Sequence, residues 1–225
     1  MLSGILRSVR VEGAVYLQAE FSAPWCIRGP YGADRAVKNF AGMQHIVHFL
    51  CIVEGDCHLR LLDEPGVVEA TAGDVIVFTR DDRHLMGSDL APAPLETSAP
   101  ADPSVDGTAD TVHPRRGAGG APTRVISGYF ACSKGMCRLL LQALPRMLHV
   151  RIGAGATASL ISELLSMAVR ESNELRPGAD GVLVKVGELL FAEALRRHTE
   201  TMPRGSAPWL SRLTQQGFAV RGLRA

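Results

Sequence analysis

The sequence QHIVHFLCIVEGDCHLRLLDEPGVVEATAGDVIVFTRDDRHLMG, residues 44–87, decides the fold class of this chain. It contains apolar runs at residues 44–53, 57–61 and 75–78, separated by an EG turn and a TAGD corner. Short apolar runs punctuated by glycine-containing turns are typical of antiparallel barrels and jelly rolls. We therefore predict a small antiparallel β-barrel, which encloses space for a small molecule or a metal ion.

Bulk composition narrows the classes of function that this chain can have. Its 225 residues suit one large domain or a domain with a helical extension. A formal net charge of +1 supplies no broad positive surface for nucleic acid or an anionic membrane. No apolar run approaches the ~20 residues that span a bilayer, and no signal-peptide core is visible at the start. The five scattered cysteines favour buried thiols in a reducing compartment, so we expect a cytoplasmic protein without membrane contact.

Composition also divides the chain into a strand-rich part and a helix-rich part. Residues 88–123 carry almost no large apolar side chains, which predicts a mobile loop that is either functional or an inserted excursion. A strand follows at residues 124–130, a connector at 147–150, and helices at 156–171 and 180–198. The prediction is an α+β fold, with a barrel at 1–134, a helical segment at 135–213 and a tail at 214–225.

Three histidines, His45, His48 and His84, suggest a metal site, because imidazole is the commonest transition-metal ligand. His45 and His48 are three residues apart, and this spacing puts their side chains on opposite faces of a regular strand. Unless a β-bulge intervenes, a hydrogen-bonding role in the cavity or at its rim is favoured for His48 or His84. No cofactor is expected; a divalent transition metal, if bound, would use His48 and His84 with His45 or Glu54.

Motifs for catalysis are absent from the sequence. It contains no GxSxG motif, no phosphate-binding glycine loop and no acidic pair at a recognisable spacing. The glycines within residues 117–120 lie in the predicted loop, without the preceding strand and following helix of a nucleotide-binding turn. An enzyme is therefore not expected.

A series of short motifs follows in a characteristic order along the chain. They are SAPW at residues 22–25, VEGDC at 53–57, AGDVIVF at 72–78, DRH at 82–84, GGAPT at 119–123 and SGYF at 127–130. In the helical part they continue with LP at 144–145, LHV at 148–150, RPGAD at 176–180 and ELLF at 188–191. Together they resemble the cupin sensor domain of AraC/XylS-type bacterial transcriptional regulators, over residues 3–213. Each motif is weakly specific by itself, and their order is much more specific.

The resemblance implies a cupin barrel that binds a small effector, a helical pair that forms a homodimer, and a C-terminal DNA-binding domain. Residues 214–225 are too few for a helix-turn-helix, so this chain alone is not expected to bind DNA. Metal-binding cupins usually carry a His-x-His pair, a glutamate and a later histidine. Here the spacing is His-x-x-His, Glu54 lies at a turn, and His84 matches the later position.

We therefore expect a ligand-sensing and dimerisation module of an AraC-type regulator. The alternatives are a metal-dependent cupin enzyme, such as an oxygenase or isomerase, and a dimerisation fragment without a ligand. In the latter, the apolar face of the helix at 180–198 packs on a second copy or covers the barrel. The candidate effector contacts are Trp25, His48, Phe49, Cys51, Phe78 and His84.

Overall fold

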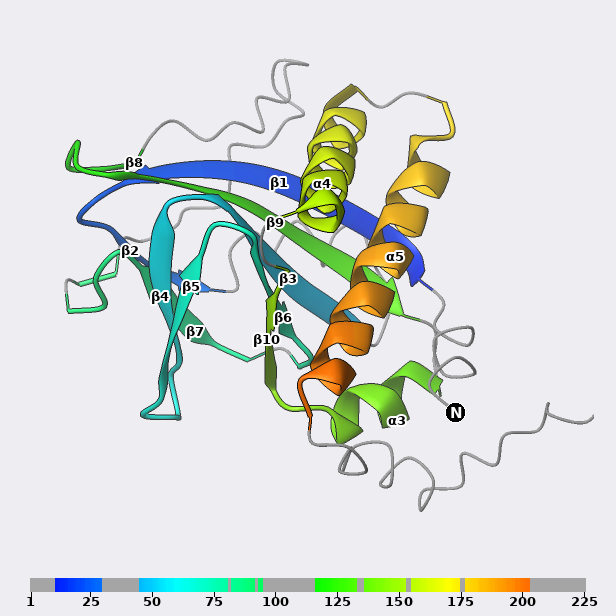
Figure 1. Cartoon of the computed structure of the whole chain (residues 1–225), viewed down its shortest axis with the longest axis horizontal. Coiled ribbons are helices and arrows are strands. Elements are labelled where there is room, and N and C mark those ends of the chain that lie inside the picture. Colours follow the sequence, from blue (N-terminus) through cyan, green and yellow to red (C-terminus); the bar gives the residue numbers. More distant parts are fainter. Residues whose placement is uncertain are drawn as a thin grey trace, which may run out of the picture.

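A computed structural model of the chain describes residues 11–29, 45–80, 82–91, 93–94, 116–132, 136–152, 155–174 and 177–202. Within these ranges, strands form two sheets, and helices lie beside the larger one (Figure 1). The predicted tail at 214–225 lies outside the described residues. The antiparallel sheets and the C-terminal helices confirm the predicted class, whereas closure into a barrel stays a prediction.

The larger sheet has six strands in the order β10-β6-β3-β9-β1-β8, and the smaller has four in the order β2-β7-β4-β5. All neighbouring strands are antiparallel except the short β8, which runs parallel to β1. The strands are β1 (Val11–Ser22), β2 (Cys26–Gly29), β3 (His45–Glu54), β4 (Asp56–Leu61), β5 (Val67–Thr71), β6 (Asp74–Phe78), β7 (His84–Gly87), β8 (Arg116–Gly117), β9 (Pro122–Cys132) and β10 (Met147–Arg151).

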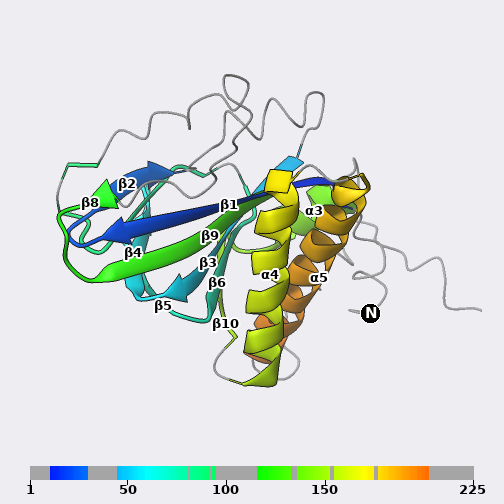
Figure 2. The same cartoon turned by 90° about the horizontal axis from the view of Figure 1, so that it is seen from above.

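Three helices complete the described fold: α3 (Met136–Ala143), α4 (Ala156–Glu174) and α5 (Ala179–Glu200). Figure 2 shows α4 and α5 side by side on one face of the larger sheet. Tyr16 of β1 is buried there, and its hydroxyl donates a hydrogen bond of 3.0 Å to the Leu183 carbonyl of α5. The helices predicted at 156–171 and 180–198 are confirmed.

The molecule has two main apolar cores, one on each face of the larger sheet. One fills the space between the sheets, which we call the inter-sheet space. The other lies between the larger sheet and the helices. Strands whose side chains alternate between the two cores can be apolar on both faces, which explains the long hydrophobic run at residues 46–53.

Residues 147–150 are a strand rather than the predicted connector. They belong to β10, which pairs with β6 at the edge of the larger sheet, and buries Leu148 and Val150. His149 Nε2 lies 2.9 Å from the buried carboxylate of Asp74 across this pair. A strand of five residues has too little local pattern to be identified without its partner, so tertiary pairing with β6 defines it.

The predicted loop at residues 88–123 is described only at its two ends. Residues 95–115 lie outside the described part of the chain. Its C-terminal end contains β8, and Pro122 already belongs to β9. Cys26, Cys51 and Cys57 are buried free thiols, as predicted. None of the helices in the described ranges is long and apolar enough to cross a membrane.

Candidate functional site

Strand β3 carries half of the predicted effector contacts, and its two faces belong to different cores. His48 lies on the same face as Leu50 and Ile52, which pack in the inter-sheet space. Phe49 and Cys51 lie on the other face and pack beneath the helices. The structure therefore does not bring Phe49 and Cys51 together with His48, because successive strand residues point to opposite sides of the sheet. A role for these two residues in effector binding stays a prediction.

Four rings form a stacked cluster in the inter-sheet space: those of His48, Phe78, His84 and Tyr129. The centroid of Phe78 lies 3.9 Å from that of His84 and 5.3 Å from that of His48. His48 lies 4.7 Å from Tyr129 and 5.4 Å from His84. His84 belongs to the smaller sheet and the other rings to the larger one, so the cluster joins the two sheets.

Local strand geometry explains why these rings meet. Tyr129 is the register partner of His48, and Phe78 is its partner on the other side of β3. Side chains of paired residues share a face of the sheet, so all three enter the inter-sheet space. His84 reaches them from β7, where it pairs with Gly29 and Leu61.

Burial keeps both histidines neutral near pH 7. His48 Nε2 lies 3.0 Å from Ser127 Oγ, and His84 Nδ1 donates to the Asp82 carbonyl at 3.1 Å. Burial, together with the neighbouring His84, lowers the pKa of His48 well below its usual value. Burial lowers the pKa of His84 to about 4, although Asp82 opposes the shift. An uncharged site favours an uncharged ligand, because a charged one would have to be desolvated without a counter-charge.

Two buried polar atoms in this region lack a hydrogen-bond partner within the described part of the chain, Trp25 Nε1 and His48 Nδ1. Trp25 belongs to the inter-sheet core and stacks on Phe21, with ring centroids 4.2 Å apart. Buried polar side-chain atoms are usually satisfied, and an unpaired one costs about 1–3 kcal/mol. Both atoms are therefore available to a polar group of a ligand.

The predicted metal ligands do not converge. Glu54 forms an ion pair of 2.6 Å with Arg124, and the side chain of His45 lies outside what the structure describes. The His48 and His84 rings are inclined by only 21°. Nitrogen lone pairs lie in the plane of an imidazole, so nearly parallel stacked rings do not aim them at one ion. Among the described residues, no group of three His, Cys, Asp or Glu side chains could hold a metal.

Sequence reasoning missed Ser127 and Tyr129, which complete the surroundings of His48. Both lie on the face of β9 that turns to the inter-sheet space, whereas Ile126 and Phe130 of the same strand pack beneath the helices. In the sequence, the only indication was a serine within the apolar pattern of a buried strand. This serine can be assigned to the surroundings of His48 only when the register of β9 against β3 is known.

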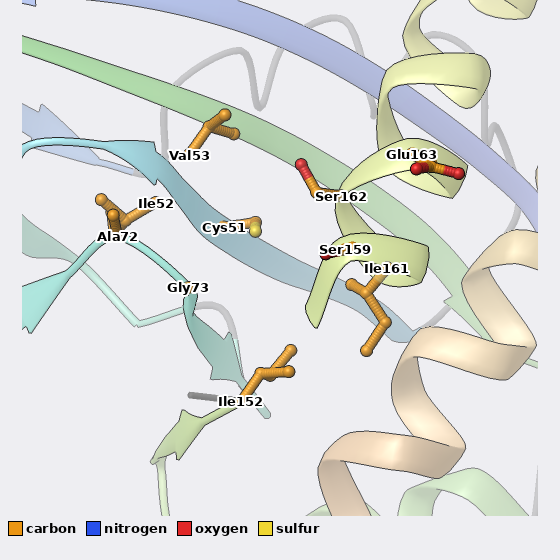
Figure 3. A pocket seen from close by; sticks show the side chains of 10 residues that line it. All are labelled: Cys51, Ile52, Val53, Ala72, Gly73, Ile152, Ser159, Ile161, Ser162 and Glu163. Carbon is orange, nitrogen blue, oxygen red and sulfur yellow. The ribbon is translucent and has the colours of Figure 1, made fainter. Parts of the chain in front are cut away.

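A groove on the opposite side of the larger sheet was also missed. It has a volume of about 440 Å³ and lies between α4, the end of β3, the turn at Gly73 and the residue after β10 (Figure 3). We call it the α4 groove. It is lined by Cys51, Ile52, Val53, Ala72, Gly73, Ile152, Ser159, Ile161, Ser162 and Glu163.

Comparisons with known proteins show what this chain is similar to. A family model described as cupin matches residues 1–200. A search of curated proteins found no match.

Among solved structures, fatty-acid-bound ToxT from Vibrio cholerae is 7% identical to this chain, with a TM-score of 0.43. The match covers 85% of this chain and 56% of ToxT. The cupin domain of Cnp3 from Schizosaccharomyces pombe is 8% identical, with a TM-score of 0.31, covering 55% of this chain and 59% of the other.

A third solved structure, YhaK from Escherichia coli, is 11% identical with a TM-score of 0.35, covering 68% of this chain and 54% of YhaK. This chain thus spans a little over half the length of each of these three proteins. Because the family model extends over residues 1–200 of 225, this chain belongs to the cupin family, as its ordered motifs predict.

Proposed function

We propose that this cupin domain is the small-molecule-sensing module of an AraC-type transcriptional regulator, and that it binds its effector rather than converting it. The effector site is the inter-sheet space beside His48 and His84. The observation that carries the proposal is the combination of stacked rings with two unpaired buried polar atoms. The ordered motifs of the sequence supply the link to regulators of this type.

The chemistry of the site indicates the class of effector. Its walls are flat aromatic and imidazole rings, which favour a planar molecule. Both histidines are neutral near pH 7, and His48 Nδ1 can donate or accept, depending on which nitrogen carries the proton. We therefore expect an uncharged heteroaromatic compound that makes at least one hydrogen bond.

Strand β3 supplies a route from the effector to the helices. Its inner face carries His48, and its outer face carries Phe49. The ring of Phe49 lies 6.1 Å from that of Phe130, which lies 5.3 Å from that of Phe191 of α5. The inter-sheet side chains are closely packed, so entry of an effector requires β3 and its neighbours to shift. An effector changes the populations of two conformational states only when it binds them with unequal affinity. The shift of β3 makes the affinity of the shifted state differ from that of the closely packed state.

The output of the domain, in this proposal, is a change in a homodimer formed through α5. Val182 and Leu189 are 39% and 51% exposed, although both are large apolar residues. They lie seven residues apart, and therefore on one side of the helix. A two-fold contact through this side would bury them. We place this regulator module in the cytoplasm.

A ligand screen with matched variants tests the effector site. Thermal unfolding is measured with indole, quinolin-2-one and nicotinamide as neutral probes, and with benzoate as a charged one. We expect a neutral probe to raise the melting temperature of the wild type but not of His48→Phe, which keeps a ring and removes the polar atoms. His58→Phe is the control, because His58 lies between the inward-facing Cys57 and Leu59 of β4 and so points away from the inter-sheet space.

Two results would contradict this proposal. Stabilisation of His48→Phe equal to that of the wild type would place the ligand elsewhere. Stoichiometric iron, zinc or manganese in protein purified without an affinity tag, lost on His84→Ala, would favour a metal-dependent enzyme instead.

A further inference from the structure

We propose that the α4 groove is a second binding site, which takes a small amphiphile with an apolar body and a protonated amine. It lies on the face of the larger sheet that turns away from the inter-sheet space. Cys51 lines it, and the neighbouring Ile52 directs its side chain into the other core. The inference therefore stands independently of the proposed effector site.

The floor of the groove is apolar. Ile152 and Ile161 are 8% and 7% exposed, and their side chains point toward one another across the groove (Figure 3). Burial, with a smaller contribution from Asp74, raises the pKa of the Cys51 thiol to about 12, so this side chain is neutral as well. A volume of about 440 Å³ is within the usual range for small-molecule sites.

The rim of the groove is polar and carries a negative charge. Ser159, Ser162 and Glu163 border it from the first two turns of α4. Within the described part of the chain, the Ser162 hydroxyl and the Glu163 carboxylate make no hydrogen bond or ion pair. Glu163 is the only charged side chain among the described residues that line the groove. Charge complementarity therefore favours a cationic head group.

The dipole of α4 does not reverse this preference. A helix N-terminus attracts anions through its free N–H groups, which belong to the first turn. In α4 these are the N–H groups of residues 156–158, which precede Ser159, the first described lining residue of this helix. The Ser159 N–H already donates to the Gly155 carbonyl at 3.1 Å. The Glu163 carboxylate carries a full negative charge, against about half a positive charge at a helix N-terminus.

Backbone hydrogen bonds preform the floor and connect it to α5. The Gly73 N–H donates to the Ile52 carbonyl at 2.9 Å, and the Ile152 N–H donates to the Gly73 carbonyl at 3.2 Å. Arg197 of α5 donates through Nη1 to the Ile152 carbonyl at 3.0 Å. An occupant would thus touch α4 directly, and also Ile152, whose carbonyl is hydrogen-bonded to α5.

The test uses three probes with the same alkyl chain: n-octylamine, octan-1-ol and octanoate, each below its aggregation concentration. Methyl resonances of the isoleucines are followed by NMR during titration of the whole chain. We expect octylamine to shift Ile152 and Ile161, while Ile27 and Ile76 of the inter-sheet core stay unchanged. Octan-1-ol should bind more weakly, and octanoate most weakly.

Matched variants assign the site and the charge. Glu163→Gln should weaken octylamine binding about two- to fivefold, the range for an exposed ion pair. Glu69→Gln makes the same charge change on exposed β5 and should leave affinity unchanged. Ser162→Phe should abolish binding by filling the groove, whereas Ser166→Phe, one turn further along α4 and not among the lining residues, should not.

Three other outcomes would overturn the proposal. If the methyl resonances of Ile152 and Ile161 do not shift up to millimolar octylamine, the groove is not a binding site for the amine. Octanoate or octan-1-ol binding as tightly as the amine would refute the cationic class of ligand. Shifts confined to Ile27 and Ile76 would move the ligand to the inter-sheet space, leaving the proposed effector site in place and the groove without a role.

Discussion

His48 and His84 show how the fold sets the chemistry of single residues. Both are buried among aromatic rings, with exposures of 4% and 1%, and each has one ring nitrogen hydrogen-bonded to the protein. A charged imidazole in this place would lose its hydration without gaining a counter-charge, so protonation is disfavoured. Neutral histidines of this kind make the folded state sensitive to acid.

The stability of the protein should therefore fall as the pH drops from about 6.5 to about 4. In this window the unfolded chain binds a proton at His84 and the folded chain does not, because the pKa is lowered to about 4 in the fold. Stability is fully present above pH 6.5, and His84 accounts for a loss of about 3 kcal/mol by pH 4. Urea unfolding between pH 4 and pH 8 measures this loss.

The variant His84→Gln serves as the reference for that measurement. It should be less stable than the wild type at pH 7 but should lose less stability on acidification. His58→Gln should follow the wild type, since His58 lies outside the ring cluster. Equal pH dependence of the wild type and His84→Gln would show that His84 is not the titrating group.

Gly29 is required for a different reason, namely space. A Cβ atom at this position would overlap the His84 ring. The His84 ring also stacks on Phe78, with centroids 3.9 Å apart, and this packing restricts its movement away from residue 29. We expect Gly29→Ala to lower the free energy of unfolding by about 1–3 kcal/mol, the usual cost of overpacking. Gly66→Ala is the control, because a Cβ there meets nothing within 4 Å. Equal stabilities of the two variants in urea would contradict the packing at His84.

At the scale of elements, α5 is the helix with the most complete set of stabilising signals. Gly178 precedes it with a φ of 84°, Asp180 lies in its first turn, and Arg197 and His198 lie in its last. The charges of Asp180 and Arg197 complement the helix dipole. Leu183, Val186, Leu190, Phe191, Ala194 and Leu195 form its buried face.

Two glycines at the start of α5 should respond to alanine in opposite directions. Gly181 is exposed within the helix and a Cβ there meets nothing within 4 Å, so Gly181→Ala should stabilise the protein by about 0.5–1 kcal/mol. Gly178 has the same free space but a positive φ, so Gly178→Ala should destabilise it by about 1–2 kcal/mol. Urea unfolding of both variants measures the difference. Destabilisation by Gly181→Ala would mean that this side of α5 is covered by another surface.

At the scale of the whole molecule, the larger sheet separates two spaces with different roles. The inter-sheet space holds the ring cluster. The opposite face of the sheet carries α4 and α5 (Figure 2), and the α4 groove lies on that side as well. Any signal from a ligand in the inter-sheet space must therefore pass through the sheet. The exposed side of α5 is the surface at which we expect a second copy.

Variants at two adjacent leucines of α5 test dimer formation separately from folding. Leu189 is 51% exposed and Leu190 is 4% exposed. Leu189→Glu should stay folded and convert the proposed dimer to a monomer, whereas Leu190→Glu should lose its folded structure, because a carboxylate would be buried without a partner. Light scattering gives the mass and circular dichroism gives the fold. A wild-type monomer, or an unchanged dimer for Leu189→Glu, would contradict an interface through α5.

Much of the fold was predictable because its signals are local. Apolar spacing located α4 and α5, and strand parity separated His48 from its neighbours on β3. β10 was not predictable, because five residues become a strand only beside β6.

The sequence by itself determined that His48 shares a face with Leu50, since side-chain direction along a strand repeats every two residues. It did not determine which face turns to the inter-sheet space, nor that Phe49 and Cys51 pack beneath the helices. Only the tertiary structure decided that Tyr129 and His84 surround His48, and that α4 leaves a groove beside Gly73. The physical reason is that register and packing depend on contacts between residues far apart in the chain, which local periodicity does not encode.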